Sequence, residues 1–150
     1  MNKDDASAVA LQRPTDFFTP EEIAYLREVD SWRSSLAIAH CWAVIVGTWI
    51  VVCLFPNPIT ITLGVMIIGT RQLGLFVLTH DGAHGALYKN RRLNDWVCEW
   101  LLNRPFTDEK IDNYRKYHVV HHANTQQEND PDLVLSKPFP ITKSSFRRKV

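Results

Sequence analysis

Two short histidine clusters are the groups in this chain best suited to chemistry. They contain five of its six histidines, in the segments His80-Asp81-Gly82-Ala83-His84 and His118-Val119-Val120-His121-His122. On helices, the spacings i, i+4 in the first cluster and i, i+3, i+4 in the second put the imidazoles of each cluster on one face. Neutral imidazole binds iron, copper and zinc. The sequence therefore predicts that these five histidines hold a redox-active metal.

Two apolar runs precede the first cluster and must position it. Residues 36–55 carry no charge, and after the turn Pro56-Asn57-Pro58 a second run covers residues 59–79. Each run has the length of about 20 residues that a helix needs to cross the hydrocarbon core of a bilayer. The pattern predicts a transmembrane helical hairpin over residues 36–79. A buried hairpin of a soluble protein is the alternative, which is disfavoured because so short a chain has little material to enclose two such runs.

Polar side chains inside the apolar runs need polar surroundings. His40 lies in the first run, and we expect it to face the helical bundle and to be hydrogen-bonded there. The second run is interrupted only by Arg71 and Gln72. Because an arginine in lipid is costly, we expect Arg71 to face the bundle or a polar cavity, or to reach the cytoplasmic boundary.

The positive charges on either side of the hairpin predict its orientation. They are Lys3, Arg13, Arg27 and Arg33 before it, and Lys89, Arg91, Arg92 and Arg104 after it. By the positive-inside rule, both ends of the hairpin and both histidine clusters lie on the cytoplasmic side of a multi-pass integral membrane protein. The formal net charge is only +1, which gives no reason to expect a nucleic-acid partner.

The remaining segments are predicted to be helices and loops outside the bilayer. Residues 1–35 are predicted to be a cytosolic tail and an amphipathic helix that begins at the N-cap Thr19 and lies on the membrane. Residues 80–135 form the histidine-cluster region, with a short interfacial helix capped by Asn94 and Asp95. Residues 136–150 form a basic C-terminal tail. The predicted fold class is an all-α membrane protein: a transmembrane hairpin with interfacial and cytosolic helices that carry the histidines.

Iron is the metal that the ligand types favour. Structural zinc sites often use cysteine, and no cysteine has a metal-type spacing here. The adjacent pair His121-His122 does not suit the two axial positions of one haem. The Glu-x-x-His pairs of soluble di-iron bundles do not occur either.

The two clusters with their flanks resemble the membrane fatty acid desaturase superfamily, which also includes hydroxylases and ketolases of lipids and carotenoids. The resemblance rests on the stretches RQLGLFVLTHDGAHGALYKNRRLND and YHVVHHANTQQENDPD. It implies a non-haem di-iron centre held by histidines of three boxes, oxygen as oxidant, a lipid or acyl substrate, and electrons from ferredoxin, cytochrome b5 or a similar carrier. The first two boxes match His80, His84, His118, His121 and His122. Asp81 and Asn124 are candidates for orienting these imidazoles, and the resemblance leaves the roles of Asp130 and Asp132 open.

The family's third box, another His-x-x-His-His, does not occur in the 150 residues. We therefore expect this chain to be the N-terminal portion of a desaturase-like domain and to be a poor enzyme alone, unless a second polypeptide complements it. Two alternatives stay open. One is a carotenoid or lipid hydroxylase or ketolase of the same superfamily, and the other is a non-catalytic membrane remnant that binds metal.

Overall fold

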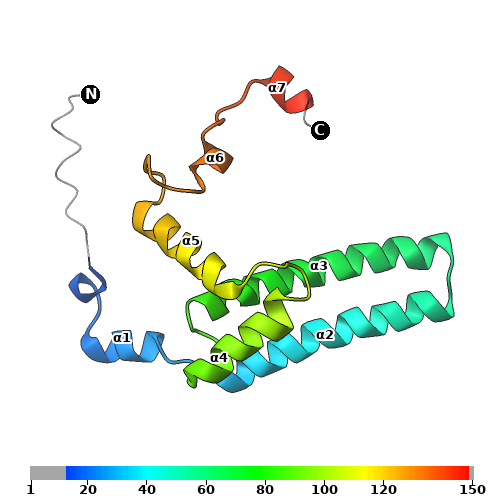
Figure 1. Cartoon of the computed structure of the whole chain (residues 1–150), viewed down its shortest axis with the longest axis horizontal. Helices are drawn as coiled ribbons and strands as arrows, with labels where there is room; N and C mark the ends of the chain where they lie inside the picture. Colours follow the sequence, from blue (N-terminus) through cyan, green and yellow to red (C-terminus); the bar gives the residue numbers. More distant parts are fainter. Residues whose placement is uncertain (1–12, 149–150) are drawn as a thin grey trace.

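The computed structural model describes residues 13–148, and that range is helical with no strand (Figure 1). Its helices are η2 (Pro14–Asp16), α1 (Pro20–Leu26), α2 (Ser31–Leu54), α3 (Pro58–Ala83), α4 (Arg91–Val97), η3 (Cys98–Asn103), α5 (Ile111–Asn124), α6 (Leu133–Ser136) and α7 (Lys143–Arg147). The predicted all-α class with a helical hairpin is confirmed. Lys3 and most of the predicted N-terminal tail lie outside the described residues.

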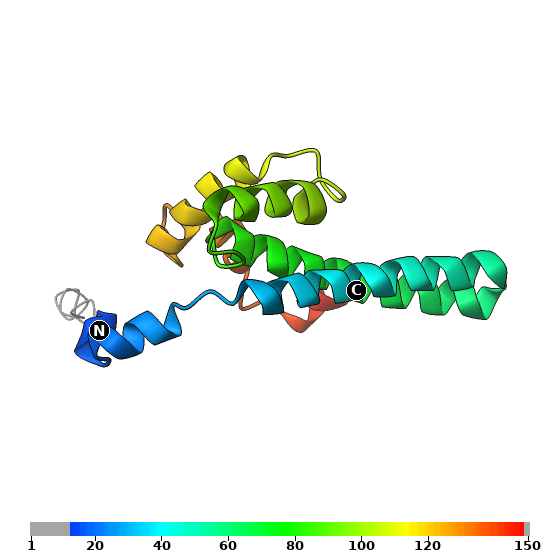
Figure 2. The ribbon, with the colours of Figure 1, turned by 90° about the horizontal axis from the view of Figure 1, so that it is seen from below.

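Helices α2 and α3 run side by side and antiparallel over their whole length (Figures 1 and 2). The predicted turn separates them, because the Asn57 side chain accepts hydrogen bonds from the backbone N–H groups of Ile59 and Thr60 and so caps α3. Pro58 occupies the first position of that helix, where a missing N–H costs nothing. At 1.5 Å per residue, α3 is about 39 Å long. It therefore exceeds the hydrocarbon core of about 30 Å, and its last turns can carry side chains beyond the bilayer.

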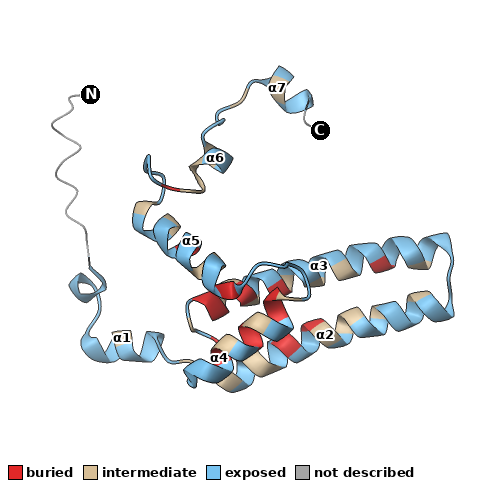
Figure 3. Cartoon of the chain, viewed as in Figure 1, coloured by how far each residue is buried: buried red, intermediate tan, exposed pale blue. Residues whose placement is uncertain are grey.

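Both hairpin helices are long and apolar enough to span a membrane. Only 11% of the apolar stretch of each helix is buried, and Figure 3 shows the exposed colour along most of the hairpin. The core helices of a soluble protein would be mostly enclosed. The exposure of these helices therefore argues against the soluble alternative.

A third helical segment packs against the end of the hairpin that lies away from the turn. It consists of α4 and the π-helical η3, which cross the hairpin diagonally (Figure 1). The main core forms here, around the side chains of Ile38, Cys41, Leu75, Leu87, Val97 and Leu102. This core is the concentration of buried residues in Figure 3. The position and tilt of the last turns of α3 are therefore fixed by contacts with α4 and η3.

The cap predicted for this segment was wrong. Asn90, and not Asn94 or Asp95, caps α4 by accepting a hydrogen bond from the Leu93 N–H. Asn94 lies within the helix and is completely buried. Its side chain donates to the Gly82 carbonyl at 2.9 Å and accepts from the Leu87 N–H at 3.2 Å. Local sequence rules assign the Asn94 side chain to a helix cap, but in the structure it makes tertiary hydrogen bonds instead.

Three predictions in the first half of the chain can be compared with the structure. The N-cap at Thr19 is confirmed, since Thr19 and Glu22 form a capping box at the start of α1. The inward orientation of His40 was wrong, because this side chain is exposed on α2. The spacing of α2 residues around the core directs Ile38 and Cys41 inward instead. Arg71 is half-buried, and its Nε lies 3.5 Å from the hydroxyl of Thr70.

Candidate metal centre

Four histidines from the two clusters meet where α5 packs against the end of α3. His80 lies in the last turn of α3, and His84 is its C-terminal cap residue. His118 and His122 lie one turn apart on α5. One ring nitrogen from each of the four falls within 4.8 Å of the others. The Nε2 atom of His118 is central, 3.0 Å from Nε2 of His84 and 2.9 Å from Nε2 of His122.

These distances suit a shared metal ion. Two nitrogens bonded to one ion at about 2.0–2.1 Å lie about 3 to 3.5 Å apart when the bond angle is near tetrahedral. The four groups can all be neutral nitrogen donors, which iron, zinc and copper accept. The donor set of this chain therefore fits a transition metal.

Burial and crowding favour the uncharged form that a metal requires. Burial, together with the neighbouring imidazoles of His80 and His122, lowers the pKa of His118 to about 4. Burial and the same two imidazoles also lower the pKa of His84. Both shifts favour the neutral ring, which is the form that can donate a nitrogen lone pair to a metal.

Arg115 joins the two clusters, although nothing in the sequence patterns singled it out. Its Nε donates to the Ala83 carbonyl at 2.9 Å, one residue before His84. Its two terminal nitrogens donate to the carboxylates of Asp95 on α4, at 2.8 Å, and Asp112 on α5, at 2.6 Å. The guanidinium has five donors in a rigid fork and so can hold several partners together. It thereby ties α5 to the end of α3.

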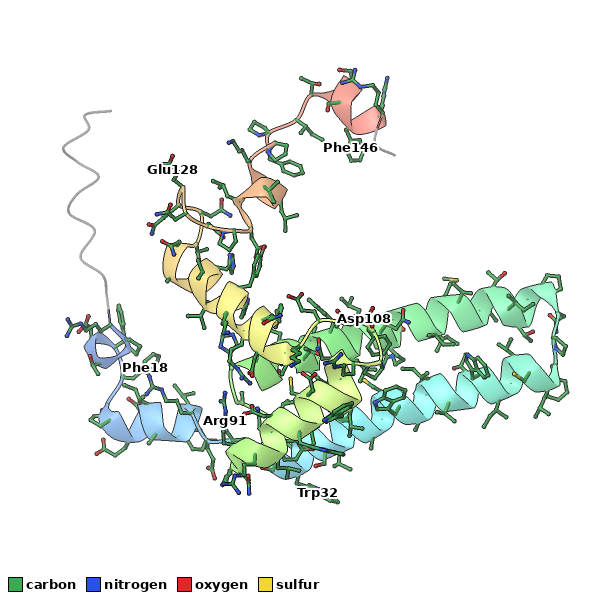
Figure 4. All side chains as sticks on the ribbon, in the orientation of Figure 1. Phe18, Trp32, Arg91, Asp108, Glu128 and Phe146 are labelled. Carbon is green, nitrogen blue, oxygen red and sulfur yellow. The ribbon has the colours of Figure 1, made fainter. Side chains whose placement is uncertain are left out.

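The start of α5 is held by a second polar contact that sequence reasoning missed. One carboxylate oxygen of Glu99 accepts from the Ile111 N–H at 2.8 Å, and the other accepts from Arg104 at 2.6 Å. These contacts bridge the two ends of the loop between η3 and α5, the loop that carries Asp108 (Figure 4). Because Glu99 lies on η3, this contact fixes where α5 begins relative to the hairpin.

An aromatic side chain lies between the cluster and a neighbouring cavity. The ring of Tyr114 stacks on His118, with centroids 5.3 Å apart and planes inclined by 11°. Its ring centroid lies 6.2 Å from that of Phe76 of α3, and the two ring planes are inclined by 65°. The cavity on the other side has a volume of about 450 Å³, and its lining includes Gln72, Phe76, Thr79, Leu102, Phe106 and Tyr114. Its lining also includes the polar side chains of Asn103, Thr107 and Glu109. The histidine cluster therefore adjoins a space at the hairpin that is lined by both apolar and polar side chains.

His121 is placed differently from the other four cluster histidines. Its Nδ1 lies 2.7 Å from Oδ1 of Asp130 and 3.3 Å from Oδ2 of Asp132. The hydrogen bond to Asp130 raises the pKa of His121. For Asp130, burial acts to raise the pKa, but hydrogen bonds from His121 and two backbone N–H groups outweigh it and lower the pKa.

The two residues expected to orient imidazoles have different contacts. Oδ1 of Asp81 lies 3.2 Å from Nδ1 of its neighbour His80. The Asn124 side chain donates to the Val120 carbonyl on its own helix at 2.9 Å. Asp130, whose role the family resemblance left open, is a buried hydrogen-bond partner of a cluster histidine. Its nine-residue separation from His121 is no helical period, so no local rule pairs them.

The chain was compared with models of protein families, with curated proteins and with solved structures. A family model described as Fatty acid desaturase matches residues 56–150, which include both histidine clusters and the second apolar helix. No curated protein and no solved structure gave a significant match. The resemblance drawn from the two histidine clusters is thereby confirmed.

Proposed function

Because the chain belongs to the fatty acid desaturase family, we propose that it takes part in the oxygen-dependent desaturation of lipid acyl chains at a non-haem iron centre. The observation that carries this proposal is the convergence of four imidazole nitrogens within 4.8 Å, at the end of a hairpin apolar enough to span a membrane. Such a site brings a redox metal close to the place where an acyl chain lies in a bilayer.

We propose His80, His84, His118, His121 and His122 as the iron ligands that this chain supplies. In the family the centre holds two irons, and histidines of a third box complete it. When bound, iron supplies the activation of oxygen that removal of hydrogen from an unactivated C–H bond requires. The residues of this chain hold neutral nitrogen donors in place, since Arg115 and Glu99 fix α5 against α3.

The cavity beside Tyr114 is the place where we propose that the acyl chain binds. The apolar side chains in its lining, including Phe76 and Leu102, would contact the methylene groups of the acyl chain. Tyr114 touches both this space and His118. A chain bound there would have its reacting carbons beside the histidine cluster. Electrons would come from ferredoxin, cytochrome b5 or a similar carrier, as the family implies.

The family is membrane-bound, and we propose that both ends of the hairpin face the cytoplasm. The turn at residues 55–58 carries no charge, whereas basic residues flank the opposite end. A reporter enzyme fused after Val150 is expected to be active only in the cytoplasm, and a reporter inserted after Asn57 only on the other side. Activity of the first fusion in the periplasm or a lumen would contradict the proposed orientation.

A genetic experiment tests the function with whatever partners the native cell provides. Deleting the coding sequence is expected to remove a particular double bond from the acyl chains of membrane lipids, as measured by gas chromatography and mass spectrometry. Re-expression of the native chain should restore this double bond, whereas the His118→Ala variant should not.

Other results of the same experiment favour the alternatives. Loss of a hydroxylated or keto lipid or carotenoid would indicate the hydroxylase or ketolase activity found in the same superfamily. An unchanged lipid profile, with a purified chain that still binds metal, would indicate a non-catalytic metal-binding protein and would contradict the proposed desaturation.

A further inference from the structure

The carboxylate of Asp130 is buried and fully engaged. Its side chain has no exposed surface. Oδ1 accepts hydrogen bonds from Nδ1 of His121 at 2.7 Å and from the Asp132 N–H at 2.9 Å, and Oδ2 accepts from the Gln126 N–H at 2.7 Å. The loop of residues 125–132 thus folds back on α5, and Gln126 takes a positive φ of 61° to allow this. Two backbone N–H groups therefore fix the carboxylate independently of the histidine.

This arrangement determines which nitrogen of His121 carries the proton. An ionised carboxylate can only accept hydrogen bonds. A neutral imidazole that bonds to it through Nδ1 must therefore be the Nδ1–H tautomer, whose lone pair is on Nε2. The ring of His121 lies 5.9 Å from that of His118 and 5.7 Å from that of His122, centre to centre. With Nδ1 held by the loop, Nε2 is the nitrogen that remains for a metal.

We propose that Asp130 is a positioning residue for the metal centre, which fixes the tautomer and the ring orientation of His121 so that Nε2 is available as a ligand. This inference deepens the proposed function, because it takes His121 to be one of the iron ligands. Metal-bound histidines commonly donate their second N–H to a carboxylate, which orients the ring and raises its basicity as a ligand. Asp130 differs from the partly exposed Asp81 in being fixed by backbone groups before any metal binds.

The tautomer can be measured directly in the purified, metal-free chain in detergent. Long-range ¹H–¹⁵N NMR spectra of chain labelled with ¹⁵N-histidine are recorded at alkaline pH, where His121 is neutral although Asp130 raises its pKa. They are expected to show His121 as the Nδ1–H tautomer, identified by the signal that disappears in His121→Ala. In Asp130→Asn the carboxamide can donate a hydrogen bond as well as accept one, so the Nδ1–H preference should weaken. Oδ2 of Asp132 also lies 3.3 Å from Nδ1, so the preference should be lost completely in the double variant with Asp132→Asn. Asp108→Asn changes an exposed aspartate of a distant loop and should leave the spectrum of His121 unchanged.

Metal affinity gives a second readout, with Co²⁺ absorption as the probe. Asp130→Asn is expected to weaken binding by about 10- to 100-fold, the usual effect of losing a partner of a ligating histidine. In a His121→Ala background the same substitution should cause no further loss, because Asp130 would have no histidine to orient. A further loss of similar size in that background would indicate a general structural role and would overturn the proposal.

If a variant fails to fold, the NMR spectrum of the native chain alone still tests the proposal. Finding His121 as the Nε2–H tautomer, or as an even mixture of tautomers, in the native chain would overturn it. An unchanged tautomer in folded Asp130→Asn would do the same. Absence of a lipid phenotype would contradict the proposed function alone, because the tautomer is measured without iron or substrate.

Discussion

Replacing His118 with alanine is expected to abolish metal binding by the purified chain. Its Nε2 is the atom that lies about 3 Å from two other donor nitrogens, those of His84 and His122. The substitution therefore removes the centre of the donor set and not a peripheral member. Loss of a mere partner of a ligand already costs about 10- to 100-fold in affinity, so we expect a loss of more than about 100-fold here. Co²⁺ or Zn²⁺ titration in detergent against a competing chelator measures this affinity.

His40→Ala is the matched control for this experiment. It removes the same side chain from the exposed face of α2, and His40 is not among the residues whose donor atoms converge. Metal affinity should therefore be unchanged. Equal affinities for His118→Ala and the native chain would show that the metal binds elsewhere, and a loss in His40→Ala would contradict the proposed ligand set.

Replacing Gly82 with alanine is expected to destabilise the fold and displace the first histidine cluster. A Cβ atom at this position would lie 2.5 Å from Sγ of Cys98 and 3.1 Å from Cδ1 of Leu87. Cys98 is fully buried, so neither the new Cβ atom nor the Cys98 side chain can move without repacking the contact between α3 and η3. Overpacking of this kind typically costs about 1–3 kcal/mol. Because Gly82 lies between His80 and His84, metal affinity should fall as well.

The same substitution at Gly47 provides the comparison. A Cβ atom there meets nothing within 4 Å, so Gly47→Ala should be neutral or slightly stabilising, by up to about 1 kcal/mol. Unfolding in detergent, followed by tryptophan fluorescence, compares the two variants. Adding Cys98→Ala to Gly82→Ala should recover part of the lost stability, since Sγ is the nearest obstacle. Equal stability of the two glycine variants would contradict the close packing described for η3.

Local rules predicted the elements of this fold from the sequence. The two apolar runs and the turn at Pro56-Asn57-Pro58 gave the hairpin, because length and hydropathy act within one helix. The capping box at Thr19 gave the start of α1 for the same reason. The histidine spacings gave a shared face within each cluster, since the helical period is a property of neighbouring residues. The family could also be recognised from the sequence, because its histidine boxes are short contiguous motifs.

Only the tertiary structure decided which partners those elements bring together. His40 lies on an exposed face of α2, and Asn94 is used in the core while Asn90 caps α4. His121 is held by Asp130 while four other histidines converge, and Arg115 joins α5 to the end of α3. The contacts of Asn94 with Gly82, of His121 with Asp130 and of Arg115 with Ala83 join residues that no helical period relates. They depend on how α3, η3 and α5 pack around a shared core, and that packing is set by the whole fold and not by any single segment.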